Sequence, residues 1–337
     1  MAKKVEESHI DTYYFSDTSF NLLMQNRIRK VLVICSSYDF FMLEEDGRID
    51  EQIFNEYVSL NLRYPPVFIH ADSAKKAIKI LENDRIDLII EMLSIGDVDT
   101  FAFAGQLKAK HPNIPIVVLT HFSREVSLKL ENEDLSSIDY VFCWLGNSDL
   151  LLAIIKLIED RMNADFDINE VGVQAILLVE DSIRYISAFL PVLYKVVLEQ
   201  TMEFMQEALN EHQKMLRRRG RPKVLLAQNY ATAVEIYRKY NNSIMGIISD
   251  VSYKMTPNRK DPKVLAGIEL CKLVKSEDRN NPFLLQSSDK SNEQYASQFG
   301  TGFLHKYSKN LSVELKDYIL SNFGFGDFIF RRPDTLE

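Results

Sequence analysis

The sequence has few of the features that mark membrane or secreted proteins. No apolar run in its 337 residues approaches the length of a membrane-spanning helix. The first residues, Met-Ala-Lys-Lys-Val-Glu-Glu, are charged and lack the apolar core of a signal peptide. The three cysteines lie far apart in apolar stretches, so no disulfide framework is expected. These absences predict a reduced, cytoplasmic protein without a membrane segment.

Several common catalytic patterns are also missing. The sequence has no phosphate-binding P-loop, no nucleophile elbow and no glycine-rich dinucleotide turn, and its six histidines show no metal-ligand spacing. A net charge of −8 argues against a protein that binds nucleic acid over a broad surface. The composition, 46% hydrophobic and 26% charged, is that of a globular protein long enough for two domains.

Short apolar runs alternate with helical patterns, and a series of five such runs occurs twice. Continuous apolar strands are typical of parallel sheets covered by helices on both faces. We therefore predict two doubly wound α/β domains, each with a five-stranded parallel, flavodoxin-like sheet and a functional site at the carboxyl ends of its strands. The runs are KVLVIC (30–35), PVFIH (66–70), DLII (87–90), PIVVLT (115–120) and DYVF (139–142), then AILLV (175–179), KVLLA (223–227), GIIS (246–249), PFLLQ (282–286) and GFLH (302–305).

Polar stretches between these runs predict the domain boundaries. The first helix of each half is longer than the fold requires. In the second half it would extend from about Ile183 to Arg218, a rod of roughly 50 Å at about 1.5 Å per residue, and so offers a surface for a homodimer. The predicted segments are a 1–28 extension with a short helix from Thr18 to Ile28, a first domain over 29–160 that ends with a helix over 149–160, a linker over 161–173, a second domain over 174–322 and a tail over 323–337.

Acidic residues follow two strands of the second half that are expected to be neighbours. Glu180 and Asp181 follow the first strand, and Asp250 follows the third. Converging carboxylates repel one another unless a cation joins them, and an oxygen-only set favours Mg²⁺. Ser287 follows strand four and Lys306 follows strand five, so a hydroxyl and an ammonium flank the acids. These groups suit phosphoryl transfer to Asp250, because the metal and the lysine neutralise the phosphoryl oxygens while the carboxylate attacks.

Four segments of the second half resemble response-regulator receiver domains: VEDS (179–182), IISDVS (247–252), PFLLQSS (282–288) and GFLHK (302–306). The resemblance implies a non-enzymatic phosphoacceptor that at most phosphorylates and dephosphorylates itself. It also implies a two-component partner, either a histidine kinase or a phosphotransfer protein, with small acyl phosphates as other donors. By the same resemblance, Mg²⁺ is bound by Glu180, Asp181, Asp250 and the backbone carbonyl of Ser252, Ser287 moves toward the phosphoryl group, and Phe303 is the switch aromatic.

Two features depart from the receiver pattern. Tyr307 stands after the lysine, where the family usually has proline. The loop over 253–266 is longer and more polar than usual, and it would either cover the site or bind a partner.

The first half is interpreted as a degenerate copy, a pseudo-receiver. Without a carboxylate cluster Mg²⁺ has no reason to bind, and methionine cannot accept a phosphoryl group. In an alternative alignment Glu91 takes the acceptor position and mimics a constant negative charge. In the alignment we prefer, Cys35 and Ser36 replace the metal-binding acids, Met92 replaces Asp250, Cys143 replaces Lys306, and only Thr120 is retained, matching Ser287.

The segment RRRGRPK (217–223) has two interpretations. One is an AT-hook that enters the minor groove of DNA. The other, which the acidic chain favours, is a basic last turn of the long helix, ended by Gly220 and Pro222.

Nearly the whole chain also resembles the N-terminal regulatory region of bacterial PEP-synthase-like proteins, which carry a PEP/pyruvate-binding domain of pyruvate phosphate dikinase type further on. The resemblance implies a C-terminal catalytic partner domain and no synthase activity in these residues. The leading hypothesis is a signalling module that relays phosphorylation of Asp250; the alternatives are a structural scaffold dimerised by the long helices and, third, DNA binding. The segments are HIDTYYFSDTSF (9–20), EEDGRIDEQIFNEYVSL (44–60), LVEDSIRYISAFLP (178–191) and NFGFGDFIF (322–330).

Overall fold

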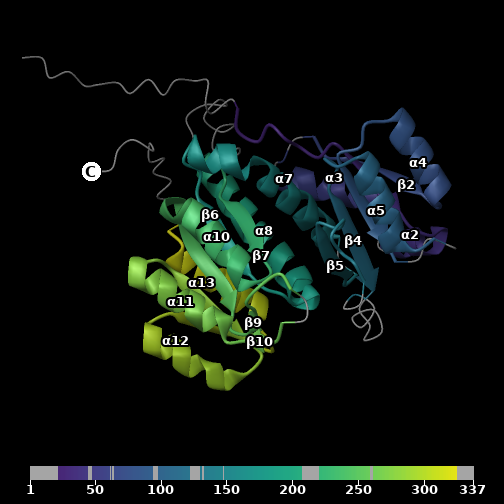
Figure 1. Ribbon diagram of the computed structural model, residues 1–337. Coiled ribbons are helices and arrows are strands. Elements are labelled where there is room, and N and C mark those ends of the chain that lie inside the picture. Colours follow the sequence, from purple (N-terminus) through teal and green to yellow (C-terminus); the bar gives the residue numbers. More distant parts are fainter. Residues whose placement is uncertain are drawn as a thin grey trace, which may run out of the picture.

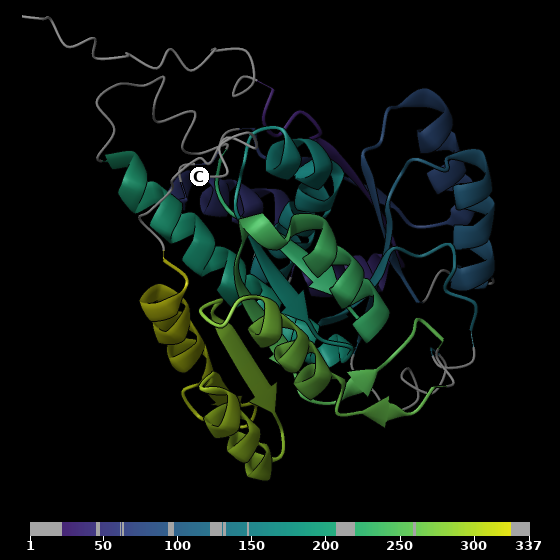
Figure 2. The same ribbon diagram turned by 60° about the vertical axis from the view of Figure 1, so that its left-hand side comes forward.

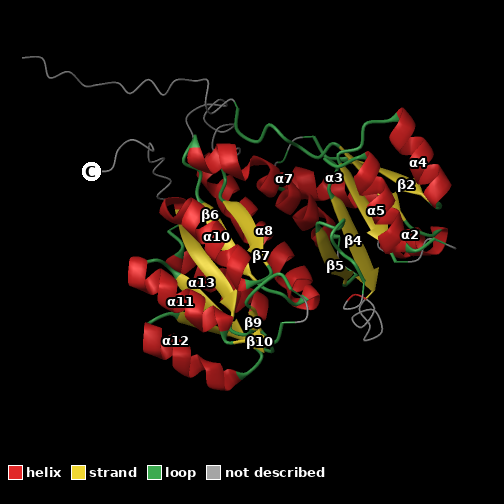
Figure 3. Ribbon diagram, in the orientation of Figure 1, coloured by secondary structure: helices red, strands yellow, loops and turns green. Residues whose placement is uncertain are grey.

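The computed structural model describes residues 22–44, 48–60, 62, 64–93, 98–121, 130, 133–146, 148–206, 220–258 and 261–324. These residues form two α/β domains side by side (Figure 1). Each domain has one five-stranded parallel sheet with helices against both faces (Figure 3). The predicted fold class, two doubly wound flavodoxin-like domains, is confirmed.

The first domain is built on a parallel sheet whose strands are β1 (Lys30–Ile34), β2 (Val67–Ala71), β3 (Leu88–Met92), β4 (Ile116–His121) and β5 (Tyr140–Trp144). Their order is β2-β1-β3-β4-β5. The helices are α2 (Ser37–Leu43), α3 (Ile49–Ser59), α4 (Ala74–Asn83), α5 (Thr100–Lys110) and α7 (Asp149–Asn169). Helices α4 and α5 bury apolar side chains against one face of the sheet, and α2, α3 and α7 cover the other.

The second domain repeats this winding. Its sheet, read from the other end, has the order β7-β6-β8-β11-β12, which again places the second strand beside the first and the first beside the third. Helices α8 and α13 cover one face, and α10, α11 and α12 cover the other. The elements are β6 (Ala175–Val179), α8 (Ile183–Gln206), β7 (Lys223–Ala227), α10 (Tyr230–Tyr240), η1 (Asn241–Ser243), β8 (Ile244–Asp250), β9 (Tyr253–Lys254), β10 (Lys263–Val264), α11 (Ala266–Glu277), β11 (Phe283–Ser287), η2 (Lys290–Asn292), α12 (Glu293–Phe299), β12 (Gly302–His305) and α13 (Leu311–Asn322).

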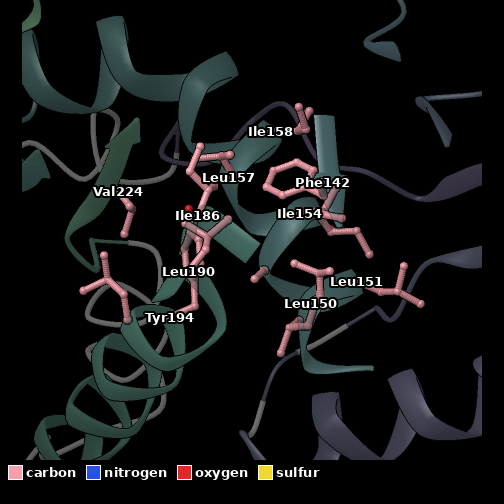
Figure 4. Close-up of a cluster of buried hydrophobic side chains, with 14 of the residues drawn as sticks. Phe142, Leu150, Leu151, Ile154, Leu157, Ile158, Ile186, Leu190, Tyr194 and Val224 are labelled. Atoms are coloured by element: carbon pink, nitrogen blue, oxygen red, sulfur yellow. The ribbon is translucent and has the colours of Figure 1, made fainter. Parts of the chain in front are cut away.

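Each domain packs one helix against the edge strand of the other domain's sheet. Helix α7 lies against β7, the edge strand of the second sheet, and Asp160 accepts a hydrogen bond from the backbone N–H of Val224 at 2.9 Å. Helix α8 lies against β5, the edge strand of the first sheet, and the Ser187 hydroxyl accepts a bond from the Cys143 N–H at 2.8 Å. Side chains of β5, α7, α8 and β7 form one apolar cluster (Figure 4). The domains therefore share a continuous core.

The predicted linker over 161–173 is wrong for most of its length, because α7 continues to Asn169. Two acids of this stretch of α7, Asp160 just before the predicted linker and Asp167 within it, are partners of buried cations. Asp160 makes two hydrogen bonds to the Arg221 guanidinium, at 2.7 and 3.0 Å, and Asp167 lies 2.6 Å from Lys223 Nζ. Arg221 and Lys223 are the described cations of the predicted basic turn, and both are buried, so they are not available to DNA.

The predicted helix over 18–28 is wrong in its described part, since residues 22–24 form a turn and residues 25–28 are irregular. Leu23 and Ile28 are buried there, and the Ile28 N–H donates to Glu159 at 3.1 Å. Of the predicted long helix, residues 207–219 lie outside the described residues. The apolar face of α8 packs on α7 and α13 of the same chain. Figure 2 shows α8 and α13 next to each other. This face of α8 is therefore already covered, and the homodimer through the long helices remains a prediction.

The start of the predicted tail belongs to the fold as well. Phe323 is buried and its ring packs against Gly246 of β8, whereas residues 325–337 lie outside the described part of the chain. Across the described residues, no helix combines the length and the apolar character needed to span a bilayer.

Candidate functional site

Three carboxylates meet at the carboxyl ends of two neighbouring strands. Glu180 and Asp181 follow β6, and Asp250 ends β8, which pairs directly with β6. One oxygen of each carboxylate lies within 4.8 Å of an oxygen of the other two. Within the described residues this is the one group of three His, Cys, Asp or Glu side chains close enough to share a metal ion. The structure thus brings the sequence-predicted acids together.

Lys306 places a buried cation between two of these acids. It follows β12, and its Nζ lies 2.5 Å from Glu180 Oε2 and 2.9 Å from Asp250 Oδ2. The same nitrogen lies 4.3 Å from the centre of the Tyr185 ring, an additional contact that stabilises a cation. Because all three groups are withdrawn from water, their mutual attraction is only weakly screened.

Glu180 is the most deeply buried of the three acids. Its Oε1 accepts a hydrogen bond from the Ser182 N–H at 3.0 Å, and its Oε2 accepts one from Gln286 Nε2 at 3.3 Å. Burial raises the pKa of Glu180 to about 7; Lys306 opposes this rise and the nearby Asp250 charge adds to it. The sequence analysis did not predict the contact between Gln286 and Glu180. The signal that could have indicated it is the position of Gln286 on β11, directly before Ser287.

Asp250 is fixed through its backbone as well as its side chain. The Val251 N–H donates to Asp250 Oδ1 at 2.7 Å. Helix α11 begins beside this turn, and a Cβ built on Gly267 would lie 2.0 Å from the Asp250 carbonyl oxygen. The Gly267 N–H donates to the Val251 carbonyl at 3.1 Å. A glycine at this position therefore lets α11 approach the strand end that presents Asp250.

The donor chemistry of the three carboxylates fits a magnesium ion. All the available ligand atoms are hard carboxylate oxygens, which Mg²⁺ and Ca²⁺ prefer over softer donors. The negative charge of three converging acids exceeds what Lys306 alone neutralises. Ser252 lies in the turn two residues after Asp250, and its carbonyl as a further ligand stays a prediction.

The predicted switch residues lie on the two strands beyond β8. Ser287 ends β11, is buried, and its hydroxyl accepts hydrogen bonds from the Asp289 N–H at 3.1 Å and from Asn292 Nδ2 at 2.9 Å. Phe303 lies on β12 opposite Leu285 and is partly buried against the apolar cluster of α10, α11 and α12. The Ser287 hydroxyl is thus held by its own loop.

The long loop after Asp250 places an unpredicted lysine on the acidic set. Residues 253–266 contain a short antiparallel hairpin of β9 and β10, which we call the β9–β10 hairpin. From it, Lys263 Nζ donates to Asp181 Oδ1 at 2.7 Å. The two residues are 82 positions apart, and no local pattern indicates their contact. Of the two expected roles of the loop, covering the site is the one that this contact supports.

The register of the two sheets aligns the first domain with the second. Ile34 pairs with Glu91 as Val179 pairs with Ser249, so Met92 takes the Asp250 position and Cys35 takes the Glu180 position. Thr120 pairs with Cys143 as Ser287 pairs with His305, so Trp144, not Cys143, takes the Lys306 position. The predicted match of Cys143 with Lys306 is therefore wrong by one residue: Cys143 matches His305. The number of residues after a strand does not fix the register in which that strand pairs with its neighbour.

At this edge of the first domain, the described residues that replace the metal-binding acids do not favour a metal ion. Burial raises the pKa of the Cys35 thiol to about 12, with a smaller contribution from Asp39, so Cys35 offers no thiolate. Glu91 is fully buried, and neither of its carboxylate oxygens has a hydrogen-bond partner. Its place in the register is that of Ser249, not of the acceptor, which disfavours the constant-charge alternative.

Comparisons with known proteins find similarity among solved structures only. No family model and no curated protein matches the chain. The signal receiver domain of a Luxo repressor protein from Vibrio parahaemolyticus is 18% identical, with 41% of this chain and 95% of that chain covered and a TM-score of 0.31. The response regulator TrrA from Thermotoga maritima, in complex with Mg²⁺–BeF, is 19% identical, with 38% and 97% covered and a TM-score of 0.30.

A two-component system response regulator/GGDEF domain protein matches over more of the chain. It is 15% identical, with 88% of this chain and 99% of that chain covered and a TM-score of 0.34. Response-regulator receiver domains are thus among the structures similar to this chain. At such identities and TM-scores, any functional conclusion depends on the residues of the site itself. The resemblance to PEP-synthase-like proteins stays a prediction.

Proposed function

We propose that the second domain is a Mg²⁺-dependent phosphoacceptor of a two-component signalling system, with Asp250 as the residue that takes up the phosphoryl group. The observation that carries this proposal is the position of Lys306 Nζ between Glu180 and Asp250, at the edge where three carboxylates converge. A buried lysine among acids that can also hold a divalent cation supplies the positive charge that a transferred phosphoryl group requires.

Each residue has a definite role in the transfer. A carboxylate oxygen of Asp250 attacks the phosphorus of a phosphohistidine or a small acyl phosphate. The new P–O bond forms as the bond from phosphorus to the donor's nitrogen or oxygen breaks, and the donor leaves with that electron pair. Lys306 is within reach of Asp250 and pairs with the phosphoryl oxygens. Glu180, Asp181 and Asp250 would hold a Mg²⁺ ion, which would neutralise further negative charge of the phosphoryl group.

The signal would leave the site through the two strands beyond β8. Rotation of Ser287 toward the phosphoryl group exchanges its two hydrogen bonds with the loop after β11 for a bond to a phosphoryl oxygen. Phe303, one strand further, is the aromatic expected to reposition with it. The protein would thus be regulatory rather than enzymatic, and the first domain a pseudo-receiver.

The proposed partners depend on the sequence resemblance. They are a cytoplasmic histidine kinase or phosphotransfer protein as the donor, and a C-terminal PEP-utilising catalytic domain as the recipient of the signal. Two of the segments that carry the second resemblance, 9–20 and most of 322–330, lie largely outside the described residues.

A structural scaffold is the competing function, and one observation favours it. Helices α7 and α8 bury a continuous apolar core across both domains, which alone could justify keeping a degenerate first domain. The scaffold needs no metal and no phosphorylation, so the two functions differ in their response to a phosphoryl mimic.

Beryllofluoride with Mg²⁺ separates the two functions. We expect it to raise the melting temperature of the wild-type chain only when Mg²⁺ is present, since it would bind Asp250 and the metal set together. Asp250→Ala should lose this rise, while Asp289→Ala, on the loop after β11, should keep it. A wild-type chain that does not respond to beryllofluoride and Mg²⁺ would favour the scaffold.

A further inference from the structure

Gln286 is a fully buried amide whose hydrogen-bonding capacity is only partly used. It lies on β11, directly before Ser287, and its side chain is withdrawn from solvent. Its Nε2 donates to Glu180 Oε2 at 3.3 Å, whereas its Oε1 has no partner among the described residues. Burial of an amide oxygen without a hydrogen bond costs free energy. The stability of the fold therefore does not explain a glutamine at this position.

The neighbours of Gln286 on its own face of the sheet would suit an apolar side chain. Side chains alternate along a strand, so Gln286 shares a face with Leu284. Leu284 belongs to the same buried apolar cluster as Leu304, which pairs with Gln286 from the neighbouring strand β12. On its other side Gln286 pairs with Asp250 of β8. The amide thus stands at the border between the apolar core and the acidic set.

The hydrogen bonds of Glu180 leave few of its lone pairs free. A carboxylate has two oxygens, with about two acceptor sites on each. Lys306 Nζ, at 2.5 Å, and Gln286 Nε2 both donate to Oε2. The Ser182 N–H donates to Oε1 at 3.0 Å. Both acceptor sites of Oε2 are therefore occupied, and Oε1 keeps one that a cation can use.

A carboxylate with a single open oxygen discriminates between metal ions. Ca²⁺ takes about six to eight oxygens and often binds both oxygens of one carboxylate. Mg²⁺ requires near-ideal octahedral geometry, which favours a single oxygen from each carboxylate. Gln286 carries no charge, in contrast to Lys263 beside Asp181, so it fills Oε2 without neutralising the acid. The negative charge of Glu180 thus stays available to a cation that needs only one of its oxygens.

We propose that Gln286 is a positioning residue that sets the specificity of the metal site: by closing Glu180 Oε2, it favours Mg²⁺ over Ca²⁺. The inference rests on the proposed function, because that function includes the metal site. The backbone of Gln286 supports this role. Its carbonyl accepts a hydrogen bond from the Val251 N–H at 3.0 Å, which ties the strand position of Gln286 to the turn that presents Asp250.

Gln286→Met tests this role, because methionine is unbranched and of similar length but cannot donate to Glu180. Calorimetric titrations of the full chain with Mg²⁺ and with Ca²⁺ give the ratio of the two affinities. We expect this ratio to shift by about three- to tenfold in favour of Ca²⁺, since Oε2 regains a free acceptor site. In EDTA, the urea midpoint of Gln286→Met should equal or exceed that of wild type, because an unpartnered buried oxygen is removed.

Asn281→Leu is the matched control. Asn281 is also buried, its Nδ2 donates to the Ile244 carbonyl at 3.3 Å, and its Oδ1 has no partner within the described part of the chain. It precedes the amino end of β11, so the length of the strand separates it from the acidic set. This variant removes a buried amide of the same kind and should keep the wild-type ratio of Ca²⁺ to Mg²⁺ affinity.

The results that overturn the inference are definite. Gln286→Met with an unchanged affinity ratio, or with both affinities changed by the same factor, contradicts a role in metal specificity. A Gln286→Met chain less stable than wild type in EDTA would show that the amide supports the fold instead. These results contradict this inference alone, whereas a wild-type chain that binds no Mg²⁺ contradicts the proposed function as well.

Discussion

The ammonium of Lys263 lies 2.7 Å from Asp181 Oδ1, so a residue of the β9–β10 hairpin occupies one of the three carboxylates proposed to hold Mg²⁺. The Asp181 side chain is 9% exposed and that of Lys263 is 51% exposed. The lysine can therefore withdraw into solvent, whereas the acid cannot. A metal ion bound by the three acids would compete with this lysine for the same carboxylate.

Lys263→Ala is expected to tighten Mg²⁺ binding. The substitution removes both a competing partner of Asp181 and a nearby like charge, and we expect a gain of about three- to tenfold in affinity. Calorimetric titration with Mg²⁺ measures it. The control is Lys272→Ala, which removes an equally exposed lysine paired with Glu269 on α11. Unchanged or weaker Mg²⁺ binding by Lys263→Ala would show that the hairpin does not compete with the metal.

Gly267→Ala is expected to disturb the phosphoacceptor turn. Its Cβ would overlap the Asp250 carbonyl, 2.0 Å away, so either α11 or the strand end must move. We expect a loss of about 1–3 kcal/mol in the free energy of unfolding, together with slower phosphorylation. Urea denaturation measures the first and a mass-based time course the second.

Gly105→Ala provides the matched glycine control. Gly105 lies within α5, and among the described residues its added Cβ would meet Ser137 Oγ alone, at an ordinary contact distance of 3.7 Å. There the substitution should be neutral or stabilising by about 0.5–1 kcal/mol, since alanine favours a helix interior. If the two substitutions had the same effect, the close approach at Asp250 would not be the cause.

Arg221→Met is expected to destabilise the contact between the domains. It would leave the Asp160 carboxylate of α7 buried without its cation, at a cost of about 3–5 kcal/mol in urea denaturation. Adding Asp160→Asn should recover part of the loss, because a neutral amide needs no counter-charge. Arg85→Met, whose side chain is 95% exposed, should have almost no effect. Equal effects at Arg85 and Arg221 would contradict a structural role for the buried pair.

Glu91 is expected to make the chain less stable at high pH. Burial, and secondarily the charge of Asp99, raises its pKa to about 9, whereas an exposed glutamate has a pKa of 4.5. The folded state thus keeps a proton that the unfolded state loses. Its contribution to stability is full below pH 4.5 and declines by about 1.4 kcal/mol per pH unit until the pH passes about 9.

Glu91→Gln should remove this decline, which urea denaturation at several pH values would measure. Glu82→Gln, at an exposed position of α4, controls for the loss of one carboxylate. A wild-type decline that persists in Glu91→Gln would mean that another group is responsible.

Local patterns were enough to predict the sheets and the acidic site. The apolar runs around Val179 and Ile248 mark the strands, and in a doubly wound sheet Glu180 and Asp250 necessarily meet where those strands end. Contacts set by tertiary packing were not predictable. The polar residues of α7 seemed solvated because their cations, Arg221 and Lys223, lie more than fifty positions away. The register of Trp144 likewise depends on the pairing of β5 with β4.

Intact-protein mass spectrometry after incubation with acetyl phosphate tests the central claim about Asp250 and Lys306 most directly. We expect the wild-type chain to gain the mass of one phosphoryl group when Mg²⁺ is present and to lose that gain in EDTA. Asp250→Ala should show no gain, and Lys306→Ala a strongly reduced one. A Mg²⁺-dependent phosphoryl group that persists in Asp250→Ala, or a wild-type chain that never acquires one, would contradict the account.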